Sequence, residues 1–395
     1  MRNVLQREWR EEKLLAWSFG GLWVFITAFL WSPSRDGVEA IYALAFFIPM
    51  LMLLPWRRPV FHQYGGWFSV SALAHASWCC ITSLWGSDTG FFILQWLILA
   101  SWLLGSAWVL QRRALDLEKL FTCLVGIGAL LALLAIVLFY KDHAVSDRLE
   151  GQGLARTPTV LGQVFGLVVL LATILSWRVA SFKQSMLFFA AALCASAALA
   201  LSQSRGPMLS LLLALLLAMV WIRPALRVWL SQITFLLLVA IVLVVMTPIE
   251  ELIAARGISL RDEIWLQVWH SMISQPLTLL SGIGMSEVTL ITTANGEYHH
   301  AHNAWLDIFY RTGAIGLLLA LTHLVLLLKR GGADTTTKSL TIWFVYGCFC
   351  LLVDSRSLFW EIDAKWLLYW VPAALLAAQL SRGLIVATTD SNTQE

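Results

Sequence analysis

The sequence predicts an all-α, polytopic membrane protein with about twelve membrane-spanning helices. Two observations carry this prediction. Of the 395 residues, 59% are hydrophobic and only 13% are charged, whereas about 25% of the residues in a soluble domain are charged. The apolar residues also gather in runs of roughly the 20 residues that a helix needs to cross a bilayer. We therefore expect one integral membrane domain over residues 1–395.

Apolar runs mark the expected spans in order along the chain. The first six cover residues 14–31, 38–55, 67–85, 90–110, 119–140 and 159–177. The other six cover residues 184–202, 207–222, 229–247, 303–328, 339–353 and 362–380. The six cysteines all lie in apolar runs, which predicts small buried side chains rather than disulfides or metal ligands.

The basic residues of the loops predict an orientation, because lysine and arginine are enriched in cytoplasmic loops. If the N-terminus is cytoplasmic and the spans alternate, every cytoplasmic loop carries a basic residue, beginning with Arg2, Arg7 and Arg10. Twelve spans then return the C-terminus to the cytoplasm. Residues 383–395 are rich in Thr, Ser and Asn, which is typical of a disordered tail.

A second group of arginines falls on the opposite, outer side of the membrane. Its members are Arg148, Arg156, Arg205, Arg256 and Arg261. The last two lie in the longest loop, 248–302, and the others lie in or beside shorter outer loops. Because these positions break the positive-inside tendency, we expect them to bind something anionic, with ordinary surface arginine as the alternative.

The long outer loop has structure of its own. Ile264, Val268 and Met272 recur at helical spacing, which predicts an amphipathic helix over 260–274 at the membrane surface. Pro276 follows the end of that helix, and a glycine-rich turn comes next.

Three histidines close this loop directly before an apolar helix. They are His299, His300 and His302. Histidine is the side chain best suited to accept a proton near neutral pH. Asp307 and Arg311 lie four residues apart in the first turns of the helix, so we expect a buried structural pair.

Arginines and a histidine on one outer surface favour group transfer from a lipid-linked pyrophosphate to a hydroxyl. The planar guanidinium suits phosphate oxygens, and fixed arginines can stabilise the charge on a leaving pyrophosphate. An anion transporter remains an alternative. Zinc binding by Glu297 with the three histidines is another, although their spacing matches no familiar zinc scaffold.

Two other groups of polar residues are expected to serve no reaction. The charged residues after the span at 339–353 are expected in a solvated outer loop, although they could line an acceptor entrance; they are Asp354, Arg356, Glu361, Asp363 and Lys365. His75 and His323 are expected to be buried histidines with satisfied hydrogen bonds.

Several motifs, taken in order, resemble the O-antigen ligase and polymerase superfamily. They are Ser204-Arg205-Gly206 after an apolar span, Arg261-x-x-x-Trp265 followed by Pro276 and Gly282-Ile283-Gly284, and His302-Asn303 followed by Gly313-x-x-Gly316. The stretch from Arg148 to Gly162 also resembles a loop of that family, although Thr157-Pro158-Thr159 stands where the family has Asn-Pro-Asn. The resemblance covers residues 145–316 by motif and the whole chain by topology.

This resemblance implies a GT-C-type glycosyltransferase bundle with one larger periplasmic loop, in the bacterial inner membrane. It implies inverting transfer without a metal or another cofactor. The donor would be O-antigen on undecaprenyl pyrophosphate, and the acceptor a sugar hydroxyl of lipid A–core. Membrane lipids are the other expected partners, and nucleic acid is not expected. The active site would face the periplasm and both termini the cytoplasm.

The resemblance also implies roles for individual residues. His302 would be the base that deprotonates the acceptor hydroxyl, and Asn303 would orient His302 or bind substrate. The residues that would bind pyrophosphate are Arg205, Arg261 and Arg256. Further possible substrate contacts are His299, His300, Arg148 and Arg156. Gly313 and Gly316 would let helices pack closely.

Three related or rival functions stay open at this point. An O-antigen polymerase uses the same donor with a second lipid-linked glycan as acceptor, and it often has two sizeable outer loops rather than one. A protein O-oligosaccharyltransferase tends to carry an additional soluble part. A transporter or flippase of an anionic lipid would place polar residues through the middle of several spans, whereas here they gather at one face.

Overall fold

The computed structural model describes most of the chain and supports a helical membrane bundle. The described residues are 2–53, 66–86, 88–225, 261–274, 276–285, 290–294, 296–329, 332 and 334–379. Among them, nine helical segments are long and apolar enough to cross a membrane. This confirms the all-α, polytopic fold class.

The elements follow the order of the predicted spans. The first are α1 (Arg2–Trp31), α2 (Arg35–Ile41), the π-helical η1 (Tyr42–Phe47), α3 (Ile48–Leu53), α4 (Gly66–Thr82), the short η3 (Ser83–Trp85), α5 (Thr89–Arg112) and α6 (Leu117–Tyr140). Next come η4 (Gly153–Ala155), α7 (Pro158–Arg178), α8 (Phe182–Leu201) and α9 (Arg205–Ile222). The last are α12 (Arg261–Ile273), α13 (Pro276–Ser281), β1 (Ile291–Thr293), β2 (Gly296–Tyr298), α14 (Ala304–Leu328), α15 (Thr335–Val353) and η5 (Trp366–Trp370).

Two predicted spans are shorter in the structure, and one lies outside it. The span expected at 67–85 is the 17-residue helix α4. The span expected at 362–380 is a shorter apolar helix, Trp366–Gln379. The predicted span 229–247 and the tail 383–395 lie outside the described residues, as does Arg256.

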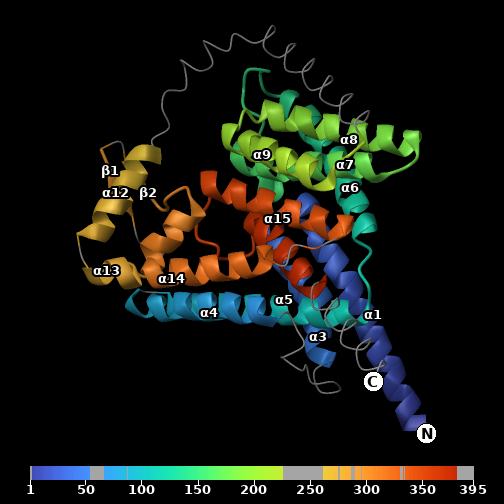
Figure 1. Cartoon of the computed structure of the whole chain (residues 1–395), viewed down its shortest axis with the longest axis horizontal. Helices are drawn as coiled ribbons and strands as arrows, with labels where there is room; N and C mark the ends of the chain where they lie inside the picture. The colour runs from blue at the N-terminus through green and yellow to red at the C-terminus, as the bar shows by residue number, and fades with distance from the viewer. Residues whose placement is uncertain are drawn as a thin grey trace.

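The bundle is arranged around α7. Every residue from 161 to 172 is buried, and α7 packs against α6, α8, α9 and α15. On the other side of the molecule, α4 runs beside α14 (Figure 1). The polar first turns of α9 and α14 are therefore held at one end of a packed apolar body.

The last apolar helix opens with a π-helical turn, η5, whose residues are all buried. A π turn disturbs regular helical pairing, and an unpaired carbonyl is costly in an apolar environment. Two indole groups from other helices satisfy this backbone: Trp343 donates to the carbonyl of Leu367 and Trp102 to that of Trp370, each at 3.0 Å. These bonds fix the helix that follows α15.

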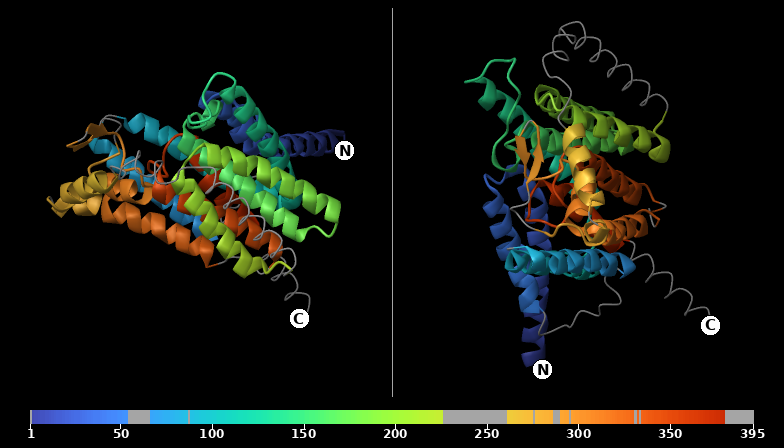
Figure 2. Two further views of the ribbon diagram at one scale, coloured as in Figure 1. Left: turned by 90° about the horizontal axis from the view of Figure 1, so that it is seen from above. Right: turned by 90° about the vertical axis from the view of Figure 1, so that its left-hand side faces the viewer.

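A small cap lies at one end of the bundle (Figure 2). It comprises α12, α13 and the antiparallel hairpin of β1 and β2, in which Ile291 pairs with Tyr298 and Thr293 with Gly296. The cap has its own apolar cluster, formed by Ile264, Val268, Met272, Ile291, Ala301 and Tyr310. The α12 helix thus buries the apolar stripe that its spacing predicted, and it packs this stripe against the start of α14.

A kink in α14 fixes the cap to the bundle. Gly313 has φ of +67° within the helix, and a Cβ there would lie 2.2 Å from the carbonyl oxygen of Leu280. The carbonyls of Tyr310 and Arg311 accept hydrogen bonds from Ile283 and Gly284 at 3.0 and 2.9 Å. The close approach expected at Gly313 is therefore between α13 and α14, and it depends on a conformation that favours glycine.

Candidate active site

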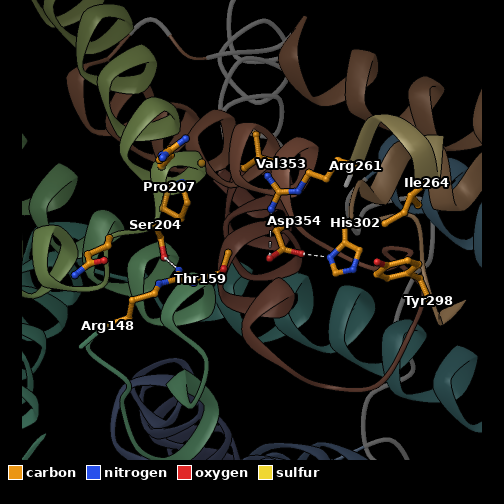
Figure 3. Close-up of a pocket in the computed structure, with 13 residues that line it drawn as sticks. Arg148, Thr159, Ser204, Pro207, Arg261, Ile264, Tyr298, His302, Val353 and Asp354 are labelled. Atoms are coloured by element: carbon orange, nitrogen blue, oxygen red, sulfur yellow. Dashed lines mark hydrogen bonds and ion pairs between the residues drawn. The ribbon is translucent and has the colours of Figure 1, made fainter. Parts of the chain in front are cut away.

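A cavity of about 370 Å³ opens at the end of the bundle where α9 and α14 begin and α8 and α15 end. We call this the site end. Three arginines line the cavity, namely Arg148, Arg205 and Arg261, together with Tyr298, His302 and Asp354. Figure 3 shows Arg148 on one wall and His302 with Tyr298 on the other, with Asp354 between them. The cavity therefore combines positive charge with one imidazole.

His302 is oriented by a carboxylate. Its Nδ1 lies 2.8 Å from Oδ1 of Asp354, the residue that follows α15 as its C-cap. Because a carboxylate accepts a hydrogen bond, Nδ1 carries the proton and Nε2 keeps its lone pair. Within the described residues, Nε2 has no hydrogen-bond partner. This nitrogen is the atom of His302 that can accept a proton.

Asp354 contacts Arg261 as well as His302. Its Oδ2 lies 3.8 Å from the guanidinium of Arg261 at the start of α12. Burial raises the pKa of the Asp354 carboxyl, but the hydrogen bond and charge of His302 together with Arg261 outweigh burial and leave this pKa below its usual value. Asp354 is therefore ionised at neutral pH and can stabilise a protonated His302.

The backbone at His302 is strained. Its φ is +52°, a region that costs a residue with a side chain about 1–3 kcal/mol. The His302 amide donates to Nδ1 of His300 at 3.2 Å. Burial lowers the pKa of His300 to about 4, and the neighbouring His302 contributes to this shift. His300 is thus a neutral acceptor that holds the His302 backbone in this conformation.

A buried ion pair joins the two segments that carry His302 and Asp354. Asp307 accepts from Arg311 at 3.0 Å, and both side chains are almost fully buried. The Asp307 carboxylate also accepts the amides of Ala301 at 3.2 Å and Ser357 at 2.8 Å. Arg311 in turn donates to the carbonyl of His299 at 2.7 Å. The pair expected from the sequence therefore lies between the histidine segment and the loop after α15.

Arg148 and Arg205 form the other wall of the cavity. Arg148 donates to the carbonyl of Ser202 and to Oγ of Ser204, both at 3.2 Å. These bonds hold the turn that leads into α9. Arg205 is the first residue of that helix and is exposed. The N-terminus of a helix adds a partial positive charge, so this wall suits an anion.

The structure does not bring every residue implied by the resemblance to this cavity. Arg156 is exposed and follows the short η4 turn, and it does not line the cavity. Asn303 caps α14, where its side chain accepts the amides of Trp305 and Leu306 at 3.0 and 3.1 Å. His299 lines a separate, smaller cavity.

Sequence reasoning missed Asp354 and Tyr298. The residues after α15 were expected in a solvated loop, but the side chain of Asp354 is 22% exposed and contacts His302. Lys365 is also buried, and it pairs with Asp363. Asp354 directly follows an apolar span, and Ser204 and Arg205 come within three residues of the end of another. A charged residue at the outer boundary of a span was the signal that could have identified it.

Possible metal ligands do not gather at the site. In the part of the chain that the structure describes, no three His, Cys, Asp or Glu side chains are arranged as a metal ion would require. Glu297 lies on β2, paired with Thr292, while the rings of His300 and His302 are tilted against each other with 4.1 Å between their centroids. The site can therefore accept a proton at Nε2 and bind an anion at its arginines.

Comparison with known proteins agrees with the resemblance. The family model described as O-Antigen ligase matches residues 189–321, a stretch that includes Arg205, Arg261 and His302. The chain is also similar to the O-antigen ligase of Pseudomonas aeruginosa strain PAO1, at 24% identity over 366 residues, 91% of this chain and 89% of that protein. The resemblance to O-antigen ligases that the motifs indicate is confirmed, and both matches are to enzymes of the glycosyltransferase type.

Proposed function

We propose that this multi-pass membrane protein, which resembles O-antigen ligases in motifs and over nearly its whole length, transfers O-antigen from undecaprenyl pyrophosphate to a sugar hydroxyl of lipid A–core. The reaction inverts the anomeric centre and uses side chains rather than a metal. The observation that carries the proposal is the contact of His302 with Asp354 in a cavity lined by three arginines.

In this proposal, Nε2 of His302 takes the proton from the acceptor hydroxyl as its oxygen attacks the anomeric carbon of the donor sugar. The bond between that carbon and the pyrophosphate oxygen breaks on the opposite face. The resulting imidazolium is balanced by Asp354, 2.8 Å from Nδ1. Because Asp354 holds the imidazole ring in place before the reaction, Nε2 can accept the proton without reorientation as positive charge develops on the ring.

The departing undecaprenyl pyrophosphate carries the bonding electron pair. In this proposal Arg205 faces it from the start of α9, Arg148 from the loop after α6, and Arg261 from the start of α12. Guanidinium groups bind phosphate oxygens in a bidentate manner. In the described residues, Arg148 and Arg205 have no carboxylate partner, so their charge is available to the leaving group.

The orientation belongs to the same proposal. Arg113 and Arg178 lie at the other end of the bundle, where α5 and α7 end. If that end is cytoplasmic, as positive loops favour, both termini are cytoplasmic and the cavity opens toward the periplasm of a bacterial inner membrane.

A reconstituted transfer assay tests the proposal. The purified full-length chain in lipid nanodiscs is given undecaprenyl-pyrophosphate-linked O-antigen and either lipid A–core or a second molecule of the lipid-linked glycan. We expect O-antigen to appear on lipid A–core, and His302→Ala to abolish it. Extension of the lipid-linked glycan, with no product on lipid A–core, would identify a polymerase and overturn the ligase assignment. No transfer to either acceptor would contradict both.

A further inference from the structure

A second cavity, of about 220 Å³, shares its polypeptide segments with the first. It is lined by His299, Arg311, Arg356 and Trp360. None of these residues lines the first cavity. His299 and Arg356 nevertheless come from the same two stretches as the first cavity, since Tyr298 and His302 flank His299, and Asp354 lies two residues before Arg356. Arg311 belongs to α14. The two cavities therefore border the same short segments.

Charge in this second cavity is unbalanced. Arg311 is paired with Asp307 at 3.0 Å. Arg356 is partly exposed and has no carboxylate within ion-pair distance among the described residues. The positive charge of Arg356 is also close enough to His300 to add, after burial and His302, to the lowering of the pKa of His300. The cavity thus carries one cationic group without a counter-charge.

Trp360 holds this cation in place. The guanidinium carbon of Arg356 lies 5.7 Å from the centre of the indole ring, and that of Arg311 lies 5.3 Å from it. Trp360 is 3% exposed, so it supports the two guanidinium groups rather than offering a broad surface to a ligand. A cation–π contact orients a guanidinium but leaves its charge unneutralised.

We propose that this cavity binds an anionic substituent, a phosphate or a carboxylate, on a sugar of the acceptor glycan, with Arg356 as its charged partner. The inference rests on the proposed function. The pyrophosphate of the donor already has Arg148, Arg205 and Arg261 in the first cavity. A volume of 220 Å³ is below the roughly 300–1,000 Å³ of sites that hold a whole ligand, and it suits one substituent group.

Binding here would place the acceptor next to the base. An anion held by Arg356 lies against the segments that also carry His302 and Asp354. A neighbouring sugar of the same glycan can then present its hydroxyl in the first cavity. Arg356 would act as a specificity residue that selects acceptors bearing the charged substituent.

The test measures binding of purified lipid A–core to the full-length chain in nanodiscs. Three probes are compared: native, enzymatically dephosphorylated and carboxyl-reduced lipid A–core. We expect Arg356→Ala to weaken binding of the native probe about tenfold or more, the loss that accompanies removal of one charge-assisted contact. Arg356→Lys should retain most of the affinity because it keeps the charge.

A control variant comes from an arginine of α2 that contacts the same loop. Arg35 pairs with Glu361, the residue after Trp360, and lines neither cavity. Arg35→Ala should therefore bind native lipid A–core within about twofold of wild type, because Arg35 lines neither cavity. Thermal unfolding of each variant shows whether a loss of binding reflects a loss of folded protein.

The probes identify the anion. If phosphate is recognised, dephosphorylation weakens binding to wild type and leaves binding to Arg356→Ala unchanged; if carboxylate is recognised, reduction does so. Equal affinities of wild type and Arg356→Ala for all three probes would overturn the inference, as would no binding of native lipid A–core by wild type. Absence of glycan transfer with Arg356-dependent binding intact would instead count against the proposed function alone.

Discussion

The arginines at the two ends of the bundle differ in their ion-pair partners. At the end opposite the site, Arg112 lies 3.8 Å from Glu11 and Arg113 lies 3.2 Å from Glu12. Arg178 pairs with Glu118 at the same end. Around the cavity, Arg148 binds only a carbonyl and a hydroxyl among the described residues.

The difference indicates where an anion is expected. Arg205 has no carboxylate partner in the described residues, and Arg261 shares Asp354 with His302. Arg35, which also lies at the site end but does not line the cavity, pairs with Glu361. Arg112, Arg113 and Arg178 at the opposite end thus have carboxylate partners, whereas Arg148 and Arg205 at the cavity have none among the described residues.

The largest effect should come from removing the base at the site end. His302→Ala is expected to lower the transfer rate by about 10²–10⁴-fold, the usual contribution of general base catalysis. His270→Ala is the matched control, because His270 is an exposed residue of α12 that does not line the cavity. A rate for His302→Ala close to that of His270→Ala would exclude a catalytic role.

The arginine comparison can be tested directly with one substitution at each end. Arg205→Ala should reduce the rate by about 10²–10³-fold if it stabilises the leaving group. Arg113→Ala removes an exposed ion pair with Glu12 and should leave the rate within about twofold. Initial rates at saturating donor and acceptor measure both. Equal losses would mean that the pairing difference carries no functional information.

A smaller change is expected when the carboxylate that orients His302 becomes an amide. Asp354→Asn should lower the rate by about 10–100-fold, the loss that follows removal of a carboxylate that orients a metal-bound histidine. The wild-type rate should fall at acidic pH because Nε2 must be unprotonated. In the variant this acidic limb should move to lower pH, since the amide no longer stabilises the imidazolium. A lower rate with an unmoved limb would indicate a structural role only.

The smallest effect concerns stability and pH. Burial lowers the pKa of His300 from 6.5 to about 4, so the unfolded chain binds more protons than the folded one between these values. Stability should therefore fall as pH decreases from 6.5 to 4. His300→Gln should reduce that slope, measured by thermal unfolding in nanodiscs at a series of pH values. An unchanged slope would show that His300 does not cause it.

Sequence alone predicted much of the fold because hydropathy alone determines which segments can cross a membrane. It also predicted the Asp307–Arg311 pair, since i and i+4 residues meet on a helix. The contact of His302 with Asp354 joins residues 52 positions apart, and no local pattern encodes it. Arg148 and Arg156 lie in one loop and look equivalent in the sequence, but Arg148 lines the cavity and Arg156, which follows η4, does not.

The structure also gives structural roles to two residues of the motifs. Asn303 was expected to orient His302 or bind substrate, yet its side chain caps α14. Asparagine is preferred at the N-cap of a helix, so capping alone explains an asparagine at this position. Gly313 was expected to allow close packing, and its positive φ shows that a kink in α14 makes that packing possible.

The most direct measurement of the central claim is lipopolysaccharide banding in a ligase-deficient strain of the native host. The strain is complemented with wild type, His302→Ala, Arg205→Ala or Arg113→Ala at equal expression. The proposal predicts long O-antigen ladders with wild type and Arg113→Ala. With the other two it predicts only lipid A–core and accumulated undecaprenyl-linked polymer. Full ladders with His302→Ala or Arg205→Ala, or none with wild type, would contradict it.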